Sequence, residues 1–255
     1  GILTKVADKL RNRGFVVRVF CVSAIYLVVS TLLELPWSIF TGWWRETQYG
    51  RTSQPLMDFL GQGLLALLIS ALLAGIFFVA IYAFIQKTKK RWWLWGGGFT
   101  GVFVAGLLII GPTYIAPLFN DYQPVPPGEV RDAVEAMAIE ANIPTERVFM
   151  YDGSRQSNNF TANVSGIGGA ARIAISDVAL DEATLDEVKA VTGHEIGHYV
   201  LGHIWDGILL TVIVIMASFF IADKAFNPTA RLFGAREDIS DPSGLPVVLF
   251  LVSLI

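Results

Sequence analysis

The segment His194-Glu195-Ile196-Gly197-His198 has the residue types and the spacing of a metal site with an adjacent base. Two histidines four residues apart lie on the same face of a helix, so both imidazoles can bind one metal ion. Glu195 is rotated by about 100° from His194 and can reach a water on that metal rather than the metal itself. The chain has only 3 histidines, and all of them lie between positions 194 and 203. This clustering favours a zinc site, with one ion per chain, over stray surface histidines.

A catalytic zinc normally has three protein ligands and one water, so a third ligand is required. His203 is one residue short of the last histidine in an HExxHxxGxxH pattern, and on a continuous helix it would point about 140° away from His198. The later acidic side chains lie in a loop with Pro and Gly and are poorly placed: Glu237, Asp238 and Asp241. We expect the third ligand to be a glutamate beyond Ile255.

The element that must position these residues is a helix, and 184–203 is predicted to form it without a break. Thr184 and Glu187 form a capping box, in which each side chain can bond to the backbone N–H of the other residue. Acidic residues in the first turn complement the positive end of the helix dipole. The apolar contacts of this helix would come from Val188, Val191, Ile196 and Val200.

The composition predicts a multi-pass membrane protein. The chain is 53% hydrophobic and 16% charged, with a mean hydropathy of +0.54. A membrane-spanning helix needs about 20 mostly apolar residues, and four runs meet or approach that length: 19–40, 60–85, 92–118 and 204–222. The 7 tryptophans lie at or near the ends of these runs, as expected for membrane–water interfaces.

A polar domain over 119–203 is expected between a three-span block over 1–118 and a returning membrane part over 204–255. It begins with a helix over 129–142 and contains three short strands, over 147–151, 162–165 and 171–177. The Gly-rich turn at 166–169 lacks the following helix and the Lys-Ser/Thr of a phosphate loop, so nucleotide binding is not expected. The single cysteine, Cys21, can form no intrachain disulfide, and nothing suggests nucleic acid.

These motifs, in this order along nearly the whole chain, resemble the integral-membrane zinc metalloproteases of the CAAX prenyl protease family, in its bacterial branch. The matching pieces are Leu35–Ser38, Glu46 with Tyr49-Gly50, Ile115–Asn120 with Pro124, Thr161–Gly166, Arg172-Ile173 with Asp177, and Val191–His203. The resemblance implies a mainly α membrane protein, in which a transmembrane helix bundle joins a small α+β, gluzincin-like zinc protease domain. His194 and His198 would bind zinc, and Glu195 would be the general base.

The resemblance also implies a peptide or protein substrate, lipidated or membrane-anchored, and a lipid bilayer as partner. The strand at 171–176 would be a free edge that pairs with an extended substrate. The substrate-binding residues would be Ala162, Asn163, Arg172, Ile173, Ala174 and Ile175. A strand paired on both sides within the domain is the alternative. The third zinc ligand of the family is a glutamate in a Glu-x-x-x-Asp motif after the last span. That motif is absent here. We expect the apolar run at 245–255 to begin a fifth span whose remainder, with whatever follows it, is missing from this sequence.

Two other functions use the same residues. One is a membrane quality-control zinc protease, and the other is a membrane scaffold whose metal site is structural or degenerate. A transporter is a weaker alternative, based on the charged Arg18 and Glu34 near the first span. The basic residues before the first and third spans place the protease domain outside the cytoplasm, whereas the eukaryotic relatives are expected to place it inside. Both orientations therefore remain open.

Overall fold

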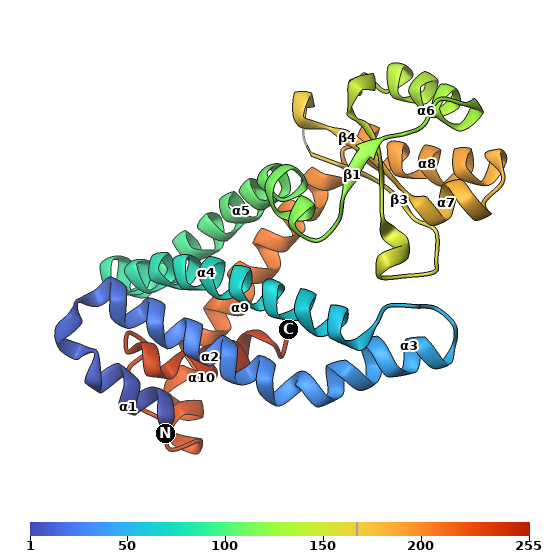
Figure 1. Cartoon of the computed structure of the whole chain (residues 1–255). Helices are drawn as coiled ribbons and strands as arrows, with labels where there is room; N and C mark the ends of the chain where they lie inside the picture. Colours follow the sequence, from blue (N-terminus) through green and yellow to red (C-terminus); the bar gives the residue numbers. More distant parts are fainter. Residues whose placement is uncertain (167) are drawn as a thin grey trace. The chain divides into compact units, whose positions relative to one another are not determined.

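The computed structural model describes residues 1–166 and 168–255, and it divides the chain into two compact units. The helical unit contains Gly1–Pro36, Gly63–Phe103 and Ile208–Ile255, and the sheet unit contains Trp37–Gln62 and Val104–Gly207. The helices and strands are shown in Figure 1. The helices are α1 (Ile2–Lys9), α2 (Phe15–Ser38), α3 (Arg45–Gln48), α4 (Leu56–Thr88), α5 (Trp92–Ile110), α6 (Glu129–Glu140), α7 (Asp177–Glu182), α8 (Leu185–Val200), α9 (His203–Leu232) and α10 (Leu245–Val252).

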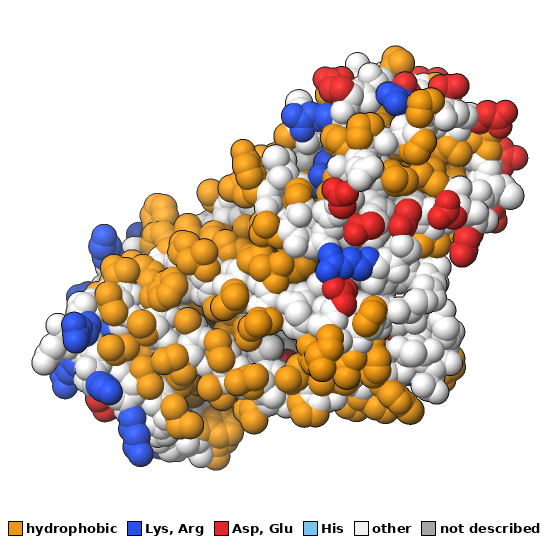
Figure 2. All heavy atoms as spheres, viewed as in Figure 1, with side chains coloured by type: hydrophobic (Ala, Val, Ile, Leu, Met, Phe, Trp, Pro, Cys, Tyr) orange, Lys and Arg blue, Asp and Glu red, His pale blue; other side chains and the backbone are white. Residues whose placement is uncertain are grey.

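Within the described residues, three helical segments are long and apolar enough to cross a membrane: Phe15–Gln48, Leu56–Leu118 and His203–Leu232. The second contains two helices, α4 and α5, joined by a 3-10 turn at Lys89–Arg91. The four predicted apolar runs therefore correspond to α2, α4, α5 and α9. Large apolar side chains on these helices are exposed, as lipid-facing residues would be, and Figure 2 shows hydrophobic side chains spread over the visible face of the helical unit.

Inside the helical unit, α5 and α9 approach closely because α5 presents glycines. A Cβ added at Gly97 would lie 2.2 Å from Cγ of Met216, and one added at Gly101 would lie 2.4 Å from Cγ2 of Val212. Close backbone approach at small residues is a usual way for membrane helices to associate. Nearby, the buried Trp92 donates from its indole N–H to Asp223 Oδ1 at 2.8 Å.

Two of the apolar helices end in π-helical turns, and each has a proline close by. The turn at Ile39–Trp44 follows Pro36, and the turn at Gly111–Ile115 contains Pro112. Proline has no backbone N–H and clashes with the carbonyl four residues before it, and both proline and π turns are common where helices bend. Both π turns belong to the sheet unit.

The sheet unit contains a four-stranded sheet in the order β1-β2-β4-β3. Its strands are β1 (Tyr122–Pro124), β2 (Val148–Tyr151), β3 (Ala162–Ser165) and β4 (Arg172–Ser176). β2 pairs with β4 in parallel, while β1 pairs with β2 and β3 with β4 antiparallel. The three predicted strands are found within one or two residues of their predicted ends, and β1 was not predicted. The predicted turn at 166–169 includes Ile167, which lies outside the described residues.

The prediction that the strand at 171–176 has a free edge is wrong. β4 is hydrogen-bonded to a neighbour on each side, with Ile173 opposite Val148 in β2 and opposite Val164 in β3. Because both sides of β4 are paired, Arg172, Ile173, Ala174 and Ile175 have no free edge to offer an added strand, and all five residues of β4 are buried. Among the described residues, β3 has no second neighbour and is the edge of the sheet on that side.

Candidate metal centre

Helix α8 fixes the two histidines by burying its opposite side. Val188, Thr192 and Ile196 are buried at four-residue spacing, so one face of α8 packs on the core of the sheet unit. The predicted capping box begins the helix: Thr184 N donates to Glu187 Oε2 at 2.8 Å, and Glu187 N donates to Thr184 Oγ1 at 3.4 Å. The histidines are consequently presented on the exposed side of a helix whose start and rotation are both determined.

The ring nitrogens of His194 and His198 converge. Their Nε2 atoms lie 3.0 Å apart, and the ring planes are inclined by 82°. Two Zn–N bonds of about 2.0–2.1 Å at a tetrahedral angle separate the nitrogens by about 3.3 Å, so the pair needs only a small adjustment to bind zinc. Neutral imidazole is also a preferred zinc ligand. The residues therefore fit the metal that the sequence predicts.

Among residues 1–166 and 168–255, no third His, Cys, Asp or Glu joins this pair to complete a metal site. Two of the later acidic side chains are occupied elsewhere: Glu237 pairs with Arg231, and Asp241 pairs with Arg18 and Arg236. These ion pairs agree with the expectation that Glu237 and Asp241 are poorly placed to bind the metal.

The prediction of one continuous helix over 184–203 is wrong, and the error concerns His203. α8 ends at Val200, Gly202 has a φ of +72°, and α9 begins at His203. Glycine adopts this left-handed conformation without steric cost. Because of the break, the side chain of His203 lies beside α8, and its Nδ1 is 2.7 Å from Nδ1 of His198. A glycine next to the histidine was the signal in the sequence that could have indicated the break.

The remaining predicted residues lie on two strands. Ala162 and Asn163 are on the edge strand β3, half-buried. The guanidinium carbon of Arg172, on β4, lies 4.2 Å from the centre of the Tyr122 ring, and its Nε is 3.4 Å from Ser165 Oγ. Burial raises the pKa of Tyr122, and the nearby cation partly offsets that rise. The Arg172 side chain thus contacts other residues of the sheet.

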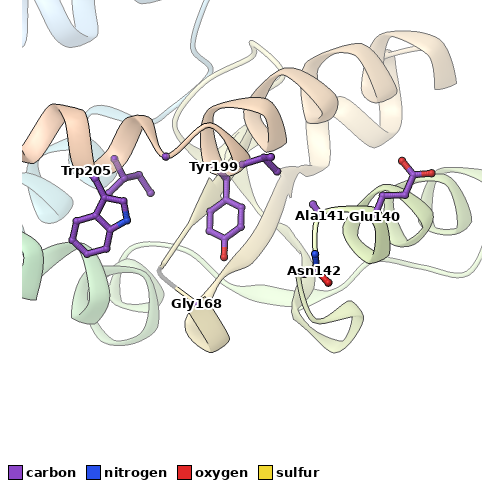
Figure 3. A pocket seen from close by; sticks show the side chains of 9 residues that line it. Glu140, Ala141, Asn142, Gly168, Tyr199 and Trp205 are labelled. Atoms are coloured by element: carbon purple, nitrogen blue, oxygen red, sulfur yellow. The ribbon is translucent and has the colours of Figure 1, made fainter.

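A pocket of about 400 Å³ lies beside the end of α8. Figure 3 shows the side chains of Tyr199 and Trp205 on the same side of α8 and α9, and Gly168 and Asn142 also line the pocket. Tyr199 follows His198 directly in the chain, but none of the three histidines lines the pocket. The pocket is therefore separate from the metal site.

Comparisons with known proteins identify the fold of this chain and then its family. The crystal structure of Ste24p from S. mikatae matches with a TM-score of 0.80 at 21% identity, covering 94% of this chain and 59% of that one. The shared fold is a membrane helix bundle with a small sheet-containing protease domain, which confirms the predicted fold class.

The sequence matches the profile "CAAX prenyl protease N-terminal, five membrane helices" over residues 1–121, and "Peptidase family M48" over residues 124–253. The chain belongs to peptidase family M48 and is a multi-pass membrane protein. The predicted family is thereby confirmed.

Three curated relatives illustrate the similarity. The uncharacterized metalloprotease YhfN of Bacillus subtilis is 30% identical over 231 residues, which is 89% of this chain and 54% of the relative. A CAAX prenyl protease 1 homolog of Oryza sativa is 29% identical over 178 residues (69% and 42%). CAAX prenyl protease 1 of Saccharomyces cerevisiae is 24% identical over 213 residues (82% and 47%). The chain thus spans about half the length of the curated relatives that it matches.

Proposed function

We propose that this protein is a zinc endopeptidase that hydrolyses peptide bonds at or near the membrane surface. The observation that carries the proposal is the convergence of the Nε2 atoms of His194 and His198, 3.0 Å apart, on a helix where Glu195 follows the first histidine. Membership of family M48 supports it. We expect one zinc ion per chain, with a glutamate outside the present sequence as third ligand.

The chemistry divides between the metal and the carboxylate. Bound zinc would act as a Lewis acid that polarises the peptide carbonyl and makes a water acidic enough to attack at neutral pH. Glu195 would accept the proton of that water and then donate it to the leaving amine, so that a neutral amine departs. Glu195 is half-buried and lies one residue after His194, which suits a base that reaches the water rather than the metal.

The substrate would bind as an added strand on β3. With β4 paired on both sides, the exposed main-chain groups on this side of the sheet are those of Ala162–Ser165. An extended peptide could continue the sheet there through main-chain hydrogen bonds, whereas side-chain pockets would set the specificity. Several residues of β3 also lie against α8, because the core side chains of Ala162 and Val164 join those of Val188 and Ile196. The proposal assigns Ala162 and Asn163 to substrate binding.

The position of the metal helix also suggests the kind of substrate. α9 begins five residues after His198 and becomes the third apolar segment, with exposed Leu209, Leu210 and Ile213. Only ten residues separate His198 from Ile208, and they include the break at Gly202. A peptide with a lipid tail or a transmembrane end is suited to a bond-cleaving site this close to the bilayer, and a freely soluble peptide does not need it.

The test uses three variants of the full-length protein. Glu195→Gln should keep zinc and fold but lose peptide cleavage by at least about 100-fold, because an amide cannot accept the proton. His194→Ala should lose both zinc and cleavage. Asp186→Asn, which removes an exposed carboxylate from the first turn of the same helix, is the control and should keep both. Near-normal turnover by Glu195→Gln, or unchanged zinc content in His194→Ala, would overturn the proposal.

The substrate class needs a second measurement. Cleavage of a prenylated peptide, the same peptide without the lipid, and a membrane-anchored protein should be compared in the same vesicles. Preference for either lipid-linked substrate supports the membrane-surface site, and a preference for the free peptide contradicts it.

A further inference from the structure

His203 contacts His198 of α8 on the side of the imidazole ring that faces away from the proposed zinc site. The ring of His198 has His194 at its Nε2, 3.0 Å away, and His203 at its Nδ1, 2.7 Å away. The two nitrogens of one imidazole point in divergent directions, so an ion bound between the two Nε2 atoms cannot also be reached by a group placed at Nδ1. In this arrangement His203 is not a metal ligand.

The hydrogen-bonding requirement of His198 suggests what His203 does. A neutral imidazole carries one N–H and one lone pair. If the lone pair at Nε2 faces the metal, the hydrogen must be on Nδ1, and that N–H needs an acceptor. Nδ1 of His203 is within hydrogen-bond distance, and it accepts when the hydrogen of His203 is on its own Nε2. Metal-binding histidines commonly donate their second N–H to such a partner, which fixes ring orientation and tautomer.

We propose that His203 is a positioning residue that holds His198 in its metal-binding tautomer and orientation. This inference rests on the proposed zinc site and adds a residue to it. It assigns a purpose to the break between α8 and α9: on a continuous helix, His203 would lie about 140° away from His198. Gly202, with its φ of +72°, interrupts the helix at that point, and Trp205 N donates to Gly202 O at 2.8 Å at the start of α9.

The inference is tested by zinc affinity, measured by competition with a chelator on the purified full-length protein. His203→Ala removes the acceptor and should weaken zinc binding by about 10- to 100-fold, the usual effect of losing such a partner. In His203→Asn, the side-chain oxygen replaces Nδ1 as acceptor at nearly the same distance from the backbone. This variant should recover most of the affinity. Asp206→Asn changes an exposed residue in the same turn and should bind zinc as the wild type does.

The outcomes separate this inference from the proposed function. A wild type that binds no zinc would contradict the proposed function itself. A wild type that binds zinc, with unchanged affinity in His203→Ala, would overturn the role of His203. Equal losses in His203→Ala and His203→Asn would overturn the acceptor role. X-ray absorption at the zinc edge should show the same number of histidine ligands in the wild type and in His203→Asn, and one histidine ligand fewer in the mutant would mean that His203 binds the metal.

Discussion

At the scale of single residues, Arg155 joins the loop after β2 to the start of α4 within the sheet unit. Its guanidinium contacts both carboxylate oxygens of Asp58, with Nε at 3.2 Å from Oδ2. Asp58 also accepts from Gln54 at 2.8 Å and from Gln62 at 3.1 Å. The hydrogen bond to Asp58 raises the pKa of Arg155. All members of this polar network belong to the sheet unit, which also contains α8. The network therefore links two segments of that unit.

A double-mutant cycle on Arg155 and Asp58 should give a coupling free energy of unfolding of at most about 1 kcal/mol. The arginine and aspartate side chains are 44% and 25% exposed, and water screens such a pair. Arg155→Lys should lose most of the coupling, because an ammonium group cannot bind both oxygens as the planar guanidinium does. Thermal unfolding of the four cycle variants and Arg155→Lys in one detergent measures this. Full coupling in Arg155→Lys would mean that the paired geometry contributes nothing.

At the scale of elements, the α5–α9 contact and the edge of the sheet each lead to a prediction. On α5, Gly97 and Gly101 are in close contact with α9, whereas a Cβ added at Gly98 would meet no atom within 4 Å. The three glycines lie in one helix and share its general environment. They differ in how closely side chains of α9 approach, so Gly98 is the control for Gly97 and Gly101.

Gly97→Ala and Gly101→Ala should destabilise the protein, and Gly98→Ala should not. The added methyl groups would overlap Met216 and Val212, and overpacking typically costs about 1–3 kcal/mol. At Gly98 the alanine should be neutral or slightly stabilising, because alanine favours the helix by about 1 kcal/mol over glycine. Thermal unfolding of the three variants is the measurement. Equal effects at all three positions would show that the close contact does not determine stability.

Backbone methylation of the substrate should reveal the strand pairing with β3. A proline or N-methyl residue at a paired position removes one main-chain donor and should block cleavage, while side-chain changes there should alter it modestly. The assay is cleavage of a peptide series with one N-methyl group moved along the positions beside the scissile bond. The pairing model does not survive if every methylated peptide is cut at the normal rate.

The sequence predicted the positions of helices and strands better than the contacts between them. The capping box determined the start of α8, and alternation of side chains located β4, because both signals are local. Alternation identifies the faces of a strand but not its neighbours, so the central position of β4 could not be predicted. β1 is three residues long and ends in Pro124, which reads as a loop. The contact of His203 depends on one backbone angle at Gly202, and helical periodicity does not report it.

At the scale of the whole molecule, several surface carboxylates have lowered pKa values. The hydrogen bond from Arg236 lowers the pKa of Asp8, and the backbone N–H of Thr184 lowers that of Glu187. Burial alone would raise the pKa of Asp241, but hydrogen bonds from Ser243 and Arg236 outweigh it, and the pKa is lowered. Such groups stabilise the folded state while they are ionised.

The protein should therefore lose stability in acid, with a window set by these carboxylates. Their stabilising contribution is complete above their unfolded pKa values, near 4, and is lost as the pH falls through the lower values of the folded state. Unfolding temperatures from pH 7 to pH 3 should be nearly constant down to about pH 5 and then fall. Asp8→Asn should lower the unfolding temperature at pH 7 and flatten the acid limb. An acid limb unchanged by Asp8→Asn would remove Asp8 from this account.

The boundary between the two units has a consequence for how this protein can evolve. The chain passes from one unit to the other four times, after Pro36, Gln62, Phe103 and Gly207. A module joined by one or two linkers can be copied, inserted or exchanged by recombination, since its ends lie together at the surface. The sheet unit is assembled from two separate stretches and offers no such pair of ends. Transfer of the sheet unit into another protein would therefore require both of its stretches to be moved together.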